Sequence, residues 1–131
     1  MADNLSDYAE NALLDHSVND GTMTVAGCFL ALFTAAPSDA GGGTEVTGNN
    51  YSRTSVPAAS WAAASGGSKS TSADVNFPTA SGSWGTITHI GLFDASTSGN
   101  LLWHGALTAS KAIGSGDVFR MASGQLTLTL A

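Results

Sequence analysis

The stretch SWGTITHIGLFDASTSGNLLWHGAL, residues 83–107, carries the clearest fold signal in the sequence. Two apolar runs of strand length flank a segment of Ser, Thr and Gly that is typical of a turn. Residues 94–100 also resemble the start of an EF-hand calcium loop, but the position that needs glutamate is Gly105. The stretch therefore predicts a β-hairpin whose turn needs a positive φ at Gly99.

The two histidines of this stretch do not form a recognisable metal site. Successive side chains of a strand point to opposite faces, so His89 and Asp94 cannot converge within one regular strand. His104 shares a face with His89 only if the hairpin places their positions opposite or an even step apart. Two imidazoles still lack the third or fourth ligand that zinc requires. We expect no metal site here.

Outside the hairpin, short apolar segments alternate with Gly-rich turns. Residues 24–34 form a continuous apolar run, which predicts a strand buried on both faces. Residues 37–50 predict a long exposed connection with a short strand inside it. The remaining predicted strands lie within residues 51–56, 61–77, 117–121 and 124–130. In the last of these, Leu126, Leu128 and Leu130 share one face. About eight short strands favour an all-β sandwich or jelly roll.

The N-terminal residues instead follow a helical period. An apolar stripe predicts an amphipathic helix over residues 3–17, with Asn4 as its N-cap and Asp7 completing a partial capping box. The stripe consists of Leu5, Tyr8, Ala9, Ala12 and Leu13. Such a short helix must dock, either on its own sheet or on a neighbouring subunit. We expect a single domain over residues 1–131, with the β-sandwich occupying residues 22–131.

Charge is scarce and uneven. Charged residues make up 11% of the chain, against about 25% in ordinary soluble domains. The first 20 residues contain five acids and no Lys or Arg. A surface so poor in charge favours association with itself or with a larger assembly, although Ser and Thr hydroxyls could also solvate a monomer. The sequence has no basic stripe for nucleic acid and no apolar run long enough for a membrane span.

The sequence contains few residues that suggest catalysis. The sequence has no nucleophile elbow, phosphate-binding loop or dinucleotide fingerprint. Cys28 lies in an apolar run and is expected to be a buried, inert thiol. The acids Glu10, Glu45, Asp94 and Asp117 show no spacing that recommends a catalytic pair. Three tryptophans could form a sugar-binding platform, although core or interface packing is the simpler interpretation: Trp61, Trp84 and Trp103. We expect no enzyme activity and no cofactor.

Three strings resemble a family of small virion proteins of tailed bacteriophages, whose members are often labelled tail-fibre or hypothetical proteins. They are LALFTAAPSDAGGGTEVTGNNYSR (30–53), SWGTITHIGLFDASTSGNLLWHGALTASK (83–111) and GSGDVFRMASGQLTLTL (114–130). The resemblance also includes the N-terminal helix and covers almost the whole chain. It implies a β-rich, non-enzymatic structural component of a virus particle, made in the host cytoplasm.

Size suggests where on the particle such a protein would sit. A compact chain of this length has a radius of gyration of ~14 Å and lacks the repeats of a fibre shaft. We therefore favour a capsid decoration, or cement, protein that forms a homotrimer and clamps the major capsid protein or another virion protein. The expected docking residues are Leu5, Tyr8, Ala12 and Leu13, with residues 40–50 as a second surface. The alternatives are a tail-fibre, tail or neck component, and a carbohydrate-binding module.

Overall fold

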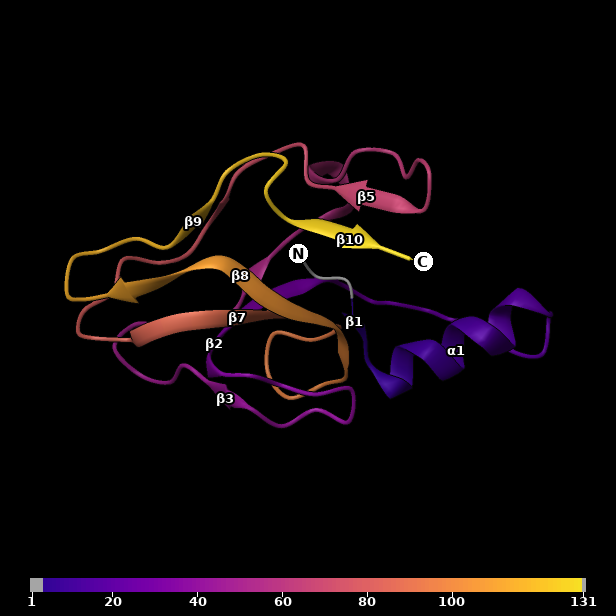
Figure 1. The fold of residues 1–131 in the computed structure, drawn as a ribbon, viewed down its shortest axis with the longest axis horizontal. Coiled ribbons are helices and arrows are strands. Elements are labelled where there is room, and N and C mark those ends of the chain that lie inside the picture. The colour runs from indigo at the N-terminus through magenta and orange to yellow at the C-terminus, as the bar shows by residue number, and fades with distance from the viewer. Residues whose placement is uncertain (1–3, 131) are drawn as a thin grey trace.

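The protein is an antiparallel β-sandwich with one short helix, as predicted (Figure 1). The structure is a computed structural model and describes residues 4–130. The main sheet has the order β1-β8-β7-β2. Two short strands, β3 and β4, pair with β2 one after the other along its remaining edge. Its strands are β1 (Asn4–Leu5), β2 (Phe29–Ala35), β3 (Thr44–Glu45), β4 (Thr54–Ser55), β7 (Gly85–Phe93) and β8 (Leu101–Ile113).

The second layer consists of two small antiparallel pairs. Here β5 (Ser68–Ser70) pairs with β10 (Thr127–Thr129), and β6 (Val75–Asn76) pairs with β9 (Arg120–Met121). A short 3-10 helix, Ala58–Ser60, precedes them. Figure 1 shows these strands along one side of the main sheet. No helix within residues 4–130 is long and apolar enough to cross a membrane.

The core lies between the two layers. In the main sheet, Leu30 of β2 pairs with Leu92 of β7, and Leu32 pairs with Ile90, so four large apolar side chains share the inner face. Further strands and connecting loops complete the cluster with Val46, Val56, Val75, Phe77, Ala80, Trp84, Ile87, Ile113, Phe119, Met121 and Leu126. Burial of this apolar surface is the main force that holds the layers together.

Strand β2 is buried on both faces, as the apolar run predicted. Ala31 and Phe33 face away from the core yet are also buried. The ring of Phe33 stacks on that of Phe93, with 6.2 Å between their centroids. The strand begins at Phe29 rather than at residue 24, because pairing with β4 and β7 starts at Phe29. The upstream Val25 is exposed.

The predicted hairpin is confirmed as β7 and β8. Its turn has the expected positive φ at Gly99, which is +75°. The second strand runs to Ile113, beyond the predicted end, because its last residues pair with the first residues of β7. The register jumps between the pairs His89–Ala106 and Ile87–Lys111, so residues 107–110 face Thr88 alone. This wide bulge bends β8.

The predicted start of the helix was wrong. Helix α1 spans Asp7–Ser17, and its N-cap is Ser6, whose hydroxyl accepts a hydrogen bond from the N–H of Ala9 at 3.1 Å. Asn4 belongs to β1 and pairs with His104, because the free edge of β8 binds its backbone there. Residue 3, the predicted first residue, lies outside the described residues.

The common face predicted for the last strand holds for only part of its length. Leu126 is buried in the core, and Leu128 is half-buried against it. Leu130 is exposed. It follows Thr129, the last residue of β10, although its backbone N–H still donates to the carbonyl of Gly67.

A buried arginine links strand β3 and the hairpin turn on the outer face of the main sheet. Arg53, 8% exposed, donates two hydrogen bonds of 2.9 Å to the carboxylate of Glu45. Its third nitrogen donates to the carbonyls of Ala95 (2.9 Å) and Ser98 (2.7 Å) in the hairpin turn. Its guanidinium carbon lies 3.7 Å from the ring centroid of Phe93. One side chain thus satisfies a carboxylate and two carbonyls while covering an aromatic ring.

Replacing Arg53→Lys tests this tie. Lysine keeps the charge but cannot form the two-pronged contact with Glu45 or lie flat on Phe93. We expect a loss of about 1–3 kcal/mol in the free energy of unfolding, measured by urea denaturation. The exposed control Arg120→Lys should change it by less than about 0.5 kcal/mol. Equal effects of the two substitutions would contradict the role given to Arg53.

Replacing Gly91→Ala tests how closely the outer face is packed. A Cβ at Gly91 would lie 2.9 Å from the Phe33 ring and 3.0 Å from Leu101. Both distances are shorter than an ordinary van der Waals contact, so an added methyl group would overpack this face. We expect the unfolding free energy to fall by about 1–3 kcal/mol. Gly114→Ala is the matched control, because its Cβ would meet no atom closer than 3.6 Å. If the Gly91→Ala variant had the same unfolding free energy as the wild type, the outer face would not be closely packed at this position.

Replacing Ser6→Ala tests the corrected start of the helix. The Ser6 hydroxyl caps the helix and also donates to the carbonyl of Leu101, so its removal should cost about 1–2 kcal/mol of stability. Asn4→Ala, at the N-cap position that the sequence predicted, should change stability by less than about 0.5 kcal/mol. Thermal unfolding of the two variants side by side gives the comparison, and the reverse order would restore Asn4 as the cap.

Candidate functional site

The stripe of α1 that was expected to dock lies partly against its own sheet. Ala9 is completely buried, whereas Ala12 and Leu13 are half-buried and Tyr8 is 47% exposed. The start of the helix is held by backbone bonds of 2.9 Å from Ser6 to Leu102 and from Asp7 to the carbonyl of Asp39. Docking on its own sheet thus uses part of the stripe, and a role toward another subunit stays a prediction.

The four predicted docking residues do not form one surface. Leu5 and Leu13 line the same groove beside α1, of about 430 Å³, together with Glu10, Leu14 and Ser17. Tyr8 lines a separate hollow of about 550 Å³, next to the loop that carries Asp39 and Gly41. That hollow joins Tyr8 to part of the second predicted surface, residues 40–50. Ala12 lines neither.

The most exposed apolar residues of this region are not among the predicted docking residues. Leu14 is 65% exposed and Val18, just after the helix, is 73% exposed. They lie outside the predicted stripe, on the opposite side of α1 from the buried Ala9. The signal in the sequence is their i, i+4 spacing, which places both on one face of a helix.

The two hairpin histidines lie on one face of the sheet. His104 is opposite Gly91 and His89 is opposite Ala106, an offset of two positions. The Nε2 atom of buried His104 lies 2.8 Å from the Oδ1 atom of Asp39, and this contact holds the loop after β2 against the sheet. Within residues 4–130, no three His, Cys, Asp or Glu side chains gather to hold a metal ion.

The turn that resembles an EF-hand loop is closed by its own first residue. The carboxylate of Asp94 accepts hydrogen bonds from the backbone N–H (2.7 Å) and the side chain (2.9 Å) of Asn100. Partial burial raises the pKa of Asp94, but these hydrogen bonds outweigh it and hold the pKa below its usual value. A Cβ at Gly99 would lie 2.6 Å from the carboxylate, so this turn is packed around its own hydrogen bonds.

Cys28, which was predicted to be buried, is half-buried in the structure. Burial raises the pKa of its thiol to about 11, so it is a neutral thiol at pH 7. Of the acids singled out by the sequence, Glu45 is bound by Arg53 and by the Tyr51 hydroxyl at 2.7 Å. Asp117 accepts a hydrogen bond of 2.8 Å from the N–H of Gly114. Glu10 is exposed.

The tryptophans do not form one exposed platform. Trp84 is buried in the core, where its indole N–H donates to the carbonyl of Asn49 at 2.9 Å. Trp61 and Trp103 are half-buried and pack against the core. This arrangement fits core packing better than a flat sugar-binding surface, where rings must be open to solvent.

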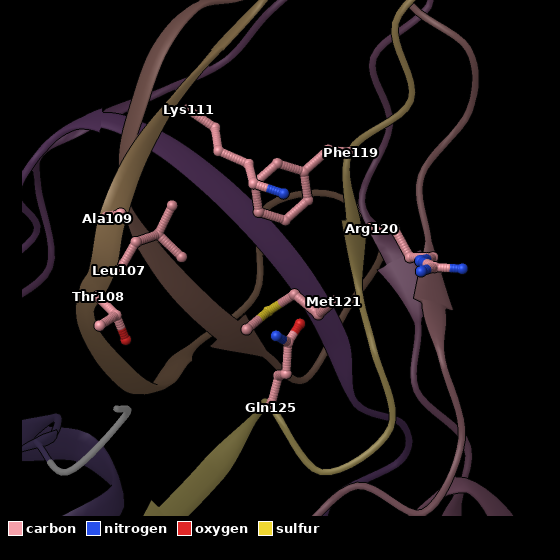
Figure 2. Close-up of a pocket in the computed structure, with 8 residues that line it drawn as sticks. All are labelled: Leu107, Thr108, Ala109, Lys111, Phe119, Arg120, Met121 and Gln125. Carbon is pink, nitrogen blue, oxygen red and sulfur yellow. The ribbon is translucent and has the colours of Figure 1, made fainter.

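A groove of about 350 Å³ lies between the bulge of β8 and the strand β9 (Figure 2). Its apolar lining comes from Leu107, Phe119 and Met121. Lys111 extends over the ring of Phe119, with its Nζ atom 5.7 Å from the ring centroid. Residues Leu107, Thr108 and Ala109 of its lining belong to the bulge, where β8 has four residues opposite one of β7.

The comparisons with known proteins give one family. The family described as "Podophage GP4 fiber I protein gp80" matches residues 4–129, nearly the whole chain. No curated protein matches. The match covers the helix, both layers of the sandwich and the hairpin, so it concerns the entire fold. The chain therefore belongs to the podophage GP4 fiber I protein family, a family of small structural proteins of the phage particle.

Proposed function

We propose that the protein is a non-enzymatic structural subunit of a phage fibre, and that it acts by docking on other copies of itself and on a neighbouring virion protein. The observation that carries this proposal is the family match over residues 4–129, because that family is described as a fibre protein. The polar clusters support it: the carboxylates of Asp39, Glu45 and Asp94 are each engaged in holding a loop.

The surface of the molecule suits such a role. Charged side chains are few, so little electrostatic repulsion or desolvation opposes burial of the surface in an assembly. Large apolar side chains remain exposed on and beside α1, at Tyr8, Leu14 and Val18. Burying them against a partner removes apolar surface from water and stabilises the assembly.

A capsid decoration, favoured by the sequence, is the second candidate. The observation in its favour is the compact sandwich that residues 4–130 form, which is the shape of a knob that caps a lattice. Such a knob stabilises a shell by mass action, because it binds the assembled lattice and not the free capsid subunits. A tail or neck position would use the same domain at lower copy number.

The copy number per particle tests these proposals. We expect quantitative mass spectrometry of purified virions to give a few to a few tens of copies of this chain, because fibres occupy few positions on a particle. The major capsid protein in the same sample is the internal reference. Hundreds of copies, near one for each capsid subunit, would replace the fibre proposal with capsid decoration. Absence of the chain from purified particles would overturn both.

A further inference from the structure

Helix α1 presents a second apolar face that its own sheet does not use. Glu10, Leu14 and Val18 follow one another at i, i+4 and i+8, and so lie along one side of the helix. Leu14 and Val18 are the two most exposed large apolar residues described. Acidic side chains, Asp7 and Asp15, flank this line on the helix, and all three acids are exposed. The face is thus an apolar strip with an acidic border.

The same molecule has a groove whose polarity and charge complement this face. The groove between β8 and β9 has the apolar lining of Leu107, Phe119 and Met121 described above. Its open rim carries the exposed Thr108. Lys111 lies over the lining and brings a positive charge to the opening (Figure 2). A leucine side chain bordered by carboxylates matches such a groove in both polarity and charge.

Lys111 is the cation best placed to receive a foreign carboxylate. Arg53 is buried and bound to Glu45, and the ammonium of Lys69 donates to the carbonyl of Ala62 at 2.8 Å. Arg120 also lines the groove, but its guanidinium lies 3.6 Å from the carboxylate of Asp74. Lys111 makes no ion pair with the residues that the structure describes, and neither do the acids on the outer side of α1. The complementary charges are therefore both available.

The helix cannot reach the groove of its own chain. Figure 1 shows α1 projecting from one end of the sandwich, beyond the start of β8, whereas β9 and the end of β8 lie toward the other end. Contact between the two surfaces must then join different copies. A contact between different patches is heterologous, and repeats of it close into a ring or extend as an open chain.

We propose that α1 of one copy docks in the β8–β9 groove of a second copy. Leu14 enters the apolar groove, Val18 covers its rim, and Glu10 or Asp15 pairs with Lys111. This inference rests on the proposed assembly of copies, but not on where in the particle they sit. The second copy is identified by charge and apolar match. Leu14 was not among the predicted docking residues, but it lines the groove beside α1 together with two of them, Leu5 and Leu13.

Cross-linking between two singly substituted proteins tests the contact. One protein carries Leu14→Cys and the other Thr108→Cys, each also carrying Cys28→Ala to remove the native thiol. Both replaced residues are exposed, so folding should be retained, as circular dichroism will verify. On mild oxidation of the mixture we expect a disulfide-linked heterodimer, several-fold more abundant than with Leu130→Cys in place of Leu14→Cys. No excess over that exposed-leucine control would overturn the proposal.

Charge reversal gives an independent readout. Sedimentation velocity should show that Lys111→Glu weakens self-association by about tenfold or more, because like charges then meet at the groove. The control Lys69→Glu should leave it unchanged. Adding Glu10→Lys and Asp15→Lys to the Lys111→Glu protein should restore at least part of the association. Wild-type protein that stays monomeric at 100 µM would overturn the docking contact, whereas the copy number in virions decides the proposed function separately.

Discussion

The rest of the structure depends on the burial of β2 on both of its faces. Its inner side chains, such as Leu32, enter the core, and its outer side chain Phe33 stacks on Phe93 of the neighbouring strand. A one-residue slip would exchange these two faces, so the register of the central sheet is strongly determined. Gly91 leaves space for the Phe33 ring, and the guanidinium of Arg53 lies over the ring of Phe93. Core and loops are thereby held by one pair of strands.

The two surfaces that we propose for assembly, on α1 and between β8 and β9, lie outside this central pair of strands. Helix α1 follows β1 at the edge of the sheet, and only one of its residues, Ala9, is completely buried. Midway along β8, four residues (107–110) stand opposite the single residue Thr88, and the groove above Phe119 lies beside this bulge. A rigid sandwich with an exposed helix and a separate groove can join copies without changing its own core. That is a suitable design for a structural subunit of a phage particle.

Much of the fold could be predicted from local patterns, because the hairpin and the apolar run each bury side chains in an obvious period. The confirmed turn at Gly99 is one example. Other features depend on contacts between distant residues, which local patterns do not contain. Asparagine is a favourable N-cap residue, yet Asn4 pairs with β8 as part of a strand, and Ser6 is the N-cap of the helix. Similarly, nothing near Arg53 in the sequence indicates that it reaches the carbonyls of a turn more than 40 residues away.

The candidate site was predicted less well than the fold. Residue type and spacing predicted the amphipathic helix, which the structure contains, whereas its role in docking stays a prediction. The sequence contains no recognisable catalytic motif. By itself it determined a β-rich, weakly charged domain of the phage particle with one amphipathic helix. Only the tertiary structure decided which side of the helix the sheet covers, and that Leu14 stays exposed while Lys111 stands over a groove. Exposure depends on what packs against a residue, and that partner lies far away in the sequence.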